Sequence, residues 1–197
     1  IAVVYNAFYG IFEKIDETPK EEKIIVSVGR LVPWKGFFTL IAIMPKLLKH
    51  FPGLKLIIAG DGPDRIMLGR SIRELGLNSS VFLVGSLPRE KLFKYIKSAS
   101  VFALNTSYEG FSHQILEAMA IGTPVVTTSI GGNPEMVRNE HNGLLVKPND
   151  SDALVRAIER LLVDDALSMT LAKNAQKTVA EFSAPRMIAE TIHILLL

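Results

Sequence analysis

The stretch IIVSVGRLVPWKGFFTLIAIMPKLLKHFPGLKLIIA, residues 24–59, decides the fold. It contains two short apolar runs rich in β-branched residues, at 24–28 and 54–59, and a helical pattern between them at 37–51. Apolar runs that do not alternate with polar residues are typical of strands buried on both faces, as in parallel sheets. A strand, a helix and a second strand in this order predict a right-handed βαβ unit.

The same alternation continues toward the carboxyl terminus. Further strands are predicted at 81–84, 101–104, 124–128 and 144–146, and an additional one is considered at 2–5. Helices are predicted at 64–75, 89–99, 112–121, 134–137, 152–162, 166–181 and 185–195. Six strands alternating with helices predict an α/β fold: a doubly wound, Rossmann-like parallel sheet with helices on both faces and strand order 3-2-1-4-5-6.

Composition excludes several classes of protein. The chain has 197 residues, which favours one domain with a core of its own. The net charge is 22 − 20 = +2, too small to favour nucleic acid as a partner. There is no cysteine, which excludes a disulfide framework, a thiolate zinc site and a cysteine nucleophile. No apolar run approaches the ~18–20 residues of a membrane-spanning helix.

The predicted strand order points to two loops. Strands 1 and 4 are neighbours where the winding of the sheet reverses, and ligands bind outside the carboxyl ends of such strands. We therefore expect a site between residues 29–36 and residues 105–111. The first loop carries two cations, Arg30 and Lys35, whose planar fork and mobile charge both suit phosphate oxygens. Two solvated surface cations are the alternative interpretation.

The second loop leads into a predicted helix whose free N–H groups and positive dipole end favour an anion. Gly110 would let a ligand approach the backbone closely. Glu109 precedes this helix and Glu117 lies eight residues later, about 12 Å along a helix axis. That separation suits two ends of an extended ligand rather than an acid/base pair on one bond. Taken singly, each glutamate is better explained by an ordinary structural role. Glu109 would interact with the start of the helix, and Glu117 would be a solvated helix residue.

Other motifs that carry chemistry are incomplete. The sequence GDGPDR at 60–65 lacks the third glycine of a dinucleotide fingerprint. The sequence DSD at 150–152 opens a predicted helix and is interpreted as an N-cap rather than a metal site. His113 fits a partly exposed helix residue at least as well as a catalytic one. We therefore expect no metal site.

Five segments, in order, resemble the carboxyl-terminal domain of retaining glycosyltransferases with the two-domain GT-B fold, in the large family 4 group. They are SVGRLVPWKGFFTLI (27–41), LIIAGDGP (56–63), VFLVGSLPREKL (81–92), YEGFSHQILEAMAIGTPVVTTSIGGNPEMV (108–137) and NGLLVKPND (142–150). Each is weak alone, whereas the ordered set is specific. Glu109 and Glu117 match the family's signature pair, and VVYNAFYGIF (3–12) resembles its hinge between domains.

The resemblance implies one nucleotide-sugar-binding domain over residues 1–197. It would comprise a hinge- or linker-like segment at 1–23, a Rossmann-like core at 24–182 and a terminal helix at 183–197. In the family such a helix often crosses back to the amino-terminal domain. We therefore expect part of the apolar stripe formed by Ile188, Ile192 and Leu195 to be exposed or to pack against another copy.

The resemblance also assigns roles to residues of the two loops. Arg30 and Lys35 would bind the donor diphosphate, Glu109 would hold sugar hydroxyls, and these three form the expected catalytic set. Glu117 would accept hydrogen bonds from the ribose. The sugar-phosphate would lie at the backbone N–H groups of residues 110–112, and the base would lie near residues 85–87. The remaining donor-binding positions are therefore Gly29, Gly85, Ser86, Leu87, Gly110, Phe111 and Ser112. The chain departs from the commonest family pattern at 112–113, where many members carry glycine and an apolar residue.

The implied activity is transfer of a hexose from a nucleotide-sugar to a glycan or lipid-linked acceptor with retention of configuration. The nucleotide-sugar is a substrate, so no cofactor is expected. The acceptor would bind in the missing amino-terminal domain, so this domain alone would be inactive. The implied location is cytoplasmic. A location at the inner face of the membrane is the alternative, through a peripheral contact made by the missing domain. The sugar, the base and the acceptor are not specified.

Two alternatives remain at this point. One is half of a GT-B-shaped sugar-nucleotide isomerase or of a phosphorylase, although no lysine with the surroundings of a pyridoxal phosphate site is identifiable. The other is a non-catalytic Rossmann-type nucleotide sensor. The presence of both glutamates together with Arg30 and Lys35 argues against the sensor.

Overall fold

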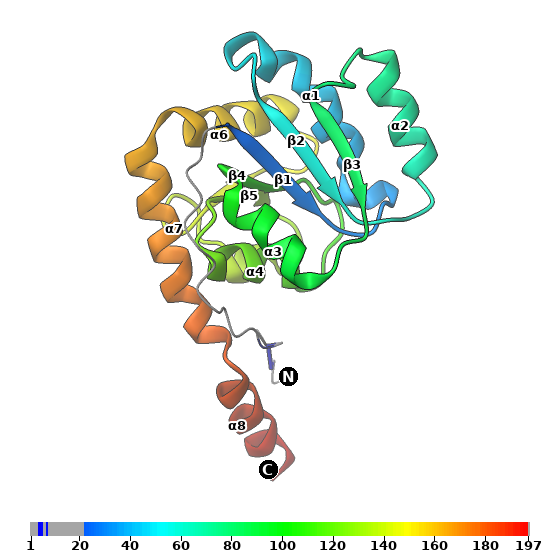
Figure 1. Cartoon of the computed structure of the whole chain (residues 1–197). Coiled ribbons are helices and arrows are strands. Elements are labelled where there is room, and N and C mark those ends of the chain that lie inside the picture. Colours follow the sequence, from blue (N-terminus) through cyan, green and yellow to red (C-terminus); the bar gives the residue numbers. More distant parts are fainter. Residues whose placement is uncertain (1–3, 6, 8–21, 197) are drawn as a thin grey trace.

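The computed structural model describes residues 4–5, 7 and 22–196, and a six-stranded parallel sheet forms its centre. The strands are β1 (Ile24–Val28), β2 (Lys55–Ala59), β3 (Val81–Gly85), β4 (Val101–Leu104), β5 (Val125–Thr128) and β6 (Leu144–Val146). Their spatial order is β3-β2-β1-β4-β5-β6, and all five neighbouring pairs are parallel. Figure 1 shows β3, β2 and β1 side by side. The predicted doubly wound order is confirmed.

Helices connect the strands and cover both faces of the sheet. They are η1 (Pro33–Lys35), α1 (Phe37–His50), α2 (Arg65–Glu74), α3 (Arg89–Ser98), α4 (His113–Ile121), α5 (Asn133–Met136), α6 (Ser151–Val163), α7 (Asp165–Val179), η2 (Ala180–Phe182) and α8 (Ala184–Leu195). Each predicted helix is present within two residues of its expected bounds. The short 3₁₀ turn η1 was not predicted. The additional strand considered at 2–5 is absent at Val4 and Tyr5, while positions 2 and 3 lie outside the described residues.

Side chains of the strands alternate between two apolar cores. Ile25 points toward the core under α1, α2 and α6, whereas its neighbour Val26 points toward the core under α3, α4 and α7. Leu56 and Ile57 alternate on β2 in the same way. Burial on both faces explains why these strands read as continuous apolar runs.

Capping residues fix where two of the helices begin and end. The Asp150 carboxylate accepts the Ala153 N–H at 2.8 Å and caps α6, as predicted for the DSD sequence. Gly122 ends α4 in the left-handed conformation, at φ 82°, where a side chain would be strained. These caps orient the connecting loops at the ends of the strands.

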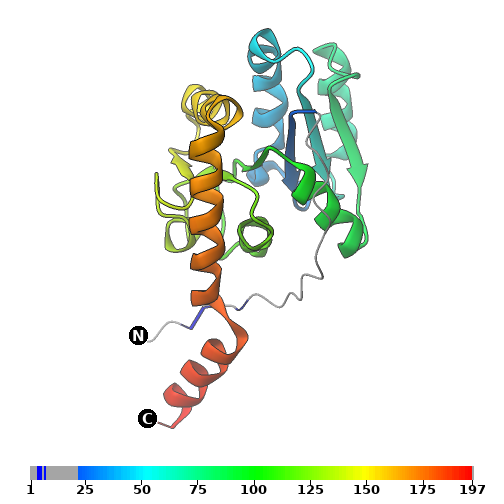
Figure 2. The same ribbon diagram turned by 60° about the vertical axis from the view of Figure 1, so that its left-hand side comes forward.

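The terminal helix α8 extends away from the sheet beyond the end of α7 (Figure 2). No residue of α8 is buried. Ile188 and Ile192 are each 52% exposed and Leu195 is 78% exposed, so the expected exposed stripe is confirmed. Within the described ranges, no helix is both long and apolar enough to cross a membrane.

One glycine between η1 and α1 is required by its neighbours. Gly36 has φ 71°, the left-handed region that glycine tolerates best. A Cβ built on it would lie 1.8 Å from the Asn105 carbonyl oxygen, which belongs to the loop after β4. The loops after β1 and β4 therefore meet backbone to backbone at this position.

We expect Gly36→Ala to lower the free energy of unfolding by at least about 2 kcal/mol, because it combines left-handed strain with a backbone clash. Gly53→Ala is the matched control, since no atom lies within 4 Å of a Cβ at Gly53. Denaturant unfolding of both variants measures the difference. Equal midpoints would show that the two loops separate at little cost.

Candidate functional site

The carboxyl ends of β1, β2 and β3 are joined by backbone contacts. The Gly29 N–H donates to the Ala59 carbonyl at 3.0 Å, and the Gly60 N–H donates to the Gly85 carbonyl at 2.8 Å. A Cβ on Gly60 would lie 1.9 Å from the Gly29 carbonyl oxygen. The predicted site positions Gly29 and Gly85 therefore lie along one continuous edge of the sheet.

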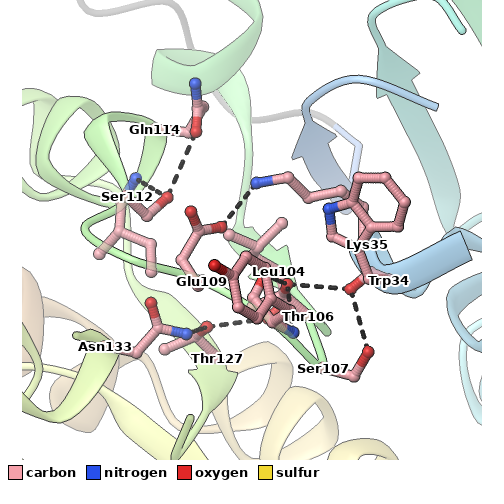
Figure 3. Close-up of polar contacts among 12 residues, drawn as sticks. Trp34, Lys35, Leu104, Thr106, Ser107, Glu109, Ser112, Gln114, Thr127 and Asn133 are labelled. Carbon is pink, nitrogen blue, oxygen red and sulfur yellow. Dashed lines mark hydrogen bonds and ion pairs between the residues drawn. The ribbon is translucent and has the colours of Figure 1, made fainter. Parts of the chain in front are cut away.

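The loop after β4 is fastened to η1 by the Trp34 carbonyl. This oxygen accepts the Thr106 hydroxyl at 2.9 Å and the Ser107 N–H at 2.8 Å. Figure 3 shows the Thr106 bond, together with a longer one of 3.5 Å from the Ser107 hydroxyl to the same carbonyl oxygen. The two loops expected to form the site are thus held together in the folded chain.

The two loops also place Lys35 and Glu109 in contact. Lys35 Nζ lies 2.6 Å from Glu109 Oε2 (Figure 3), and each side chain is only 13% exposed. The stem of Lys35 passes over Gly29, with its Cδ and Cε 3.6 Å from a Cβ built there. The cation expected at the diphosphate and the carboxylate expected at the sugar are therefore ion-pair partners in this structure.

Arg30 lies on the same loop but is not engaged in this pair. It is exposed, and its side chain forms no hydrogen bond or ion pair with any residue that the structure describes. Its guanidinium is therefore available to an anion arriving from solvent. The structure places Arg30 beside the other predicted residues without assigning it a partner.

The backbone before α4 presents unused donors. Among the described residues, none accepts a hydrogen bond from the N–H of Gly110, Phe111 or Ser112. Gly110 is exposed, and no atom lies within 4 Å of a Cβ built on it. These N–H groups precede the positive end of α4, an arrangement that favours anion binding.

Ser112 caps α4 with its side chain. Its Oγ accepts the Ile115 N–H at 3.4 Å and donates to Gln114 Oε1 at 3.3 Å, and the residue is 1% exposed. The helix therefore starts at His113, one residue later than predicted. The Ser112 Oγ is thus engaged within the helix start, and the backbone role expected for this residue stays a prediction.

A third loop, which the sequence interpretation missed, supports Glu109 from behind. A Cβ on Gly131 would lie 1.7 Å from the Glu109 carbonyl oxygen, and one on Gly132 would lie 1.9 Å from that of Gly110. The buried Asn133 side chain anchors this loop by donating to Thr127 Oγ1 and to the Thr128 carbonyl, both at 3.1 Å. The adjacent glycines were the available sign of this close packing.

Glu117 lies on α4, eight residues after Glu109, and has a different environment. Its side chain is 18% exposed, and its Oε1 lies 3.5 Å from Arg89 Nη2 at the start of α3. Burial raises the pKa of the Glu117 carboxyl, and the nearby Arg89 and His113 offset this effect only in part. Glu117 is therefore a carboxylate whose charge is poorly solvated in the folded chain.

Two arginines that the sequence interpretation did not select flank the loop expected to bind the base. Arg89 follows this loop directly and contacts Glu117. Arg65 Nη2 donates to the Leu83 carbonyl at 3.3 Å, and its Nη1 would lie 3.8 Å from a Cβ on Gly85. Within the loop, Ser86 is exposed and Leu87 packs against the core. The sheet order, which places β3 beside β2, is what brings Arg65 there.

The charged groups near α4 do not form a metal centre. Across the part of the chain that the structure describes, no group of three or more histidine, aspartate or glutamate residues is arranged to hold a metal ion. The carboxylates of Glu109 and Glu117 instead face Lys35 and Arg89, respectively.

The raised pKa of Glu117 gives a pH-dependent prediction. The folded chain holds this proton more strongly than the unfolded chain, so ionisation costs folding free energy as pH rises from below 4.5 through the raised pKa. We expect Glu117→Gln to raise the melting temperature at pH 7 by about 1–3 °C. The gain should disappear below pH 4.5, where both states of the parent are protonated, and Glu74→Gln, at an exposed position of α2, should show none. A pH-independent difference would contradict this origin.

Comparison with known sequences places these features in a family. The sequence profile described as Glycosyl transferases group 1 matches residues 11–178. A glycosyltransferase of Methanocaldococcus jannaschii, itself uncharacterized, is 38% identical over 175 residues, which cover 88% of this chain and 45% of that protein. LpsE of Rhizobium meliloti, a lipopolysaccharide core biosynthesis glycosyltransferase, is 34% identical over 85% of this chain and 48% of its own. The chain thus spans about half the length of these curated relatives.

Solved structures show the same relationship. Sucrose-phosphate synthase from Thermosynechococcus elongatus has a TM-score of 0.82 at 33% identity, over 90% of this chain and 46% of that chain. Anabaena HepE, determined in complex with UDP-glucose, has a TM-score of 0.81 at 28% identity, over 90% of this chain and 50% of its own. With a profile match over most of its length, and with relatives more than 30% identical over the same region, the chain belongs to the group 1 glycosyltransferases.

Proposed function

We propose that this chain is the donor-binding half of a retaining, GT-B-fold glycosyltransferase of the family 4 type, which transfers a hexose from a nucleotide-sugar. The observation that carries the proposal is the arrangement along α4. An ion pair of Lys35 and Glu109 stands before the helix, unused N–H groups stand at its start, and Glu117 stands eight residues beyond Glu109. A nucleotide-sugar offers matching groups in the order sugar, diphosphate and ribose.

Each residue has one role in this proposal. Arg30 and Lys35 bind the diphosphate, together with the N–H groups of residues 110–112. Glu109 accepts hydrogen bonds from the sugar hydroxyls once Lys35 has turned to the phosphates. Glu117 accepts hydrogen bonds from the ribose, and the base lies over residues 85–87. HepE, a relative in fold and sequence, was determined with UDP-glucose, which makes uridine diphosphate sugars the first donors to test.

The chemistry follows from where charge develops. When the bond between the anomeric carbon and the donor phosphate oxygen breaks, the electron pair stays on the diphosphate. Arg30, Lys35 and the amino end of α4 stabilise this growing negative charge, as an oxyanion hole does. The acceptor oxygen bonds to the anomeric carbon on the face that the diphosphate leaves. Its proton passes to a donor phosphate oxygen, so the chain itself supplies no general base.

The acceptor, in this proposal, is a glycan or a lipid-linked sugar and binds to a part of the enzyme outside this chain. Transfer needs donor and acceptor held together in one cleft, and such positioning supplies ~7–11 kcal/mol of the barrier reduction. The chain spans about half of its curated relatives, and we therefore propose that it binds donor but catalyses little transfer alone.

Charge reversal at Arg30 tests the diphosphate site. We expect Arg30→Glu to weaken binding of the preferred nucleoside diphosphate by at least ~1.5–3 kcal/mol, the range for a hydrogen bond to a charged group. Arg156→Glu on α6 makes the same change in net charge at an exposed position of another helix and should leave the affinity unchanged. Calorimetric titration measures both. An unchanged affinity for Arg30→Glu would remove this residue from the site.

The two glutamates should respond in opposite ways. Glu109→Gln frees Lys35 from its partner, so free nucleoside diphosphate should bind about two- to fivefold more tightly, while the gain from the attached sugar is lost. Glu117→Gln should weaken nucleotide and nucleotide-sugar alike by roughly tenfold or more. Glu74→Gln, at an exposed position of α2, controls for loss of a charge. If Glu109→Gln and Glu117→Gln weaken both ligands to the same extent, the division of roles is wrong.

A further inference from the structure

Three aromatic rings from distant parts of the sequence meet beside the start of α4. The Tyr5 ring stacks on Phe111 with ring centres 5.7 Å apart, and it meets Phe182 edge-on at 5.6 Å. Phe111 and Phe182 are 5.4 Å apart, which closes the group. We call Tyr5, Phe111 and Phe182 the aromatic cluster.

The aromatic cluster is anchored to the protein core at one side. Phe182, in η2 between α7 and α8, is 6% exposed and belongs to the core under α3, α4 and α7. Tyr5 and Phe111 are partly buried and pack against the same core. Phe111 therefore contacts the core residue Phe182 on one side and Tyr5 on another. Aromatic pairs at these separations attract beyond their burial of area.

Phe111 connects the aromatic cluster to the candidate site. It lies two residues after Glu109 and directly before Ser112, whose side chain caps α4. The N–H groups of residues 110–112 have no acceptor among the described residues, so no main-chain hydrogen bond from them fixes this turn. The ring of Phe111 is thus the main side-chain anchor between Glu109 and the cap.

Tyr5 also reaches the loop that supports Glu109 from behind. The nearby Glu135 carboxylate raises the pKa of the Tyr5 phenol, through hydrogen bonding first and through its charge second. Glu135 lies in α5, directly after the glycines that pack against the carbonyls of Glu109 and Gly110. Tyr5 therefore contacts both of the segments that determine where Glu109 lies.

We propose that the aromatic cluster is a positioning device, through which the location of Tyr5 controls the geometry of residues 109–112 and hence recognition of the sugar. Tyr5 and Phe182 are positioning residues, since they act through Phe111 and touch no ligand group. This inference rests on the proposed function, because it assumes that residues 109–112 meet the sugar-phosphate end of a donor. Displacing Tyr5 should loosen the sugar end of the site and leave the ribose end at Glu117 intact.

The first experiment needs no ligand and is independent of the proposed function. Amide hydrogen exchange is measured at Ile115 and Leu116, whose N–H groups bond Ser112. Tyr5→Leu should speed exchange at both by about three- to tenfold, the range for loss of aromatic pairing. Tyr95→Leu is the matched control, because Tyr95 is also half-buried against the same core but lies on α3. Equal exchange in both variants would overturn the proposal.

The second experiment compares two affinities in each variant. UDP, GDP and ADP are titrated with and without an attached glucose, and the pair that binds most tightly is used. Tyr5→Leu should reduce the affinity gained from the attached sugar by about three- to tenfold and change nucleotide affinity less than twofold. Tyr5→Phe retains the ring and should keep the parental ratio, as should Tyr95→Leu.

The outcomes separate the two proposals. Two results in Tyr5→Leu overturn the positioning role and leave the proposed function standing. One is nucleotide binding with an unchanged ratio of nucleotide-sugar affinity to nucleotide affinity. The other is equal weakening of nucleotide and nucleotide-sugar binding. Loss of the affinity gained from the sugar in Tyr5→Phe overturns the role given to the aromatic cluster, because the hydroxyl facing Glu135, and not the ring, would then be responsible. If the unmodified chain binds none of these ligands, the proposed function fails and this inference fails with it.

Discussion

The meeting of the loops after β1 and β4 is the constraint on which the site depends. Lys35 and Glu109 face each other across this junction at 2.6 Å, with little of either side chain exposed to water. Charges at such a position are costly unless they are paired. The fold secures the pairing with main-chain contacts on both sides, at Trp34 and at Gly36. A ligand that replaces one partner must therefore supply the charge that the other loses.

The two glutamates, one before α4 and one on it, have different electrostatic environments. Glu109 has its counter-charge within hydrogen-bonding distance, whereas Glu117 has Arg89 farther away, at 3.5 Å, and a pKa raised by burial. A carboxylate that is poorly solvated in the free protein gains more from neutral hydroxyl donors than a fully hydrated one does. Natural proteins often tolerate such a cost in stability where a residue binds a ligand, which is the role proposed for Glu117.

Much of this arrangement could be predicted from the sequence because it follows from periodicity. Both-face burial of strands such as β1 gave continuous apolar runs, and the doubly wound order then placed Lys35 and Glu109 at one junction. The support from Gly131 and the pairing of Arg89 with Glu117 were not predictable in this way. They depend on the approach of loops and of helices from different βα units, for which a single sequence carries no periodic signal. The start of α4 was missed by one residue because Ser112 serves as its cap.

The glycines along the carboxyl edge of the sheet divide the site into a part that resists variation and a part that permits it. At Gly36, Gly60 and Gly131, main chain lies against main chain with no room for even a methyl group. Mutation at these places cannot adjust the shape of the candidate site by small steps. Ser86 and Gln114, by contrast, are side chains on surfaces that no such contact restricts. For the proposed donor site, altered ligand preference would therefore depend on a few replaceable side chains carried by a main-chain frame that has no room for an added methyl group.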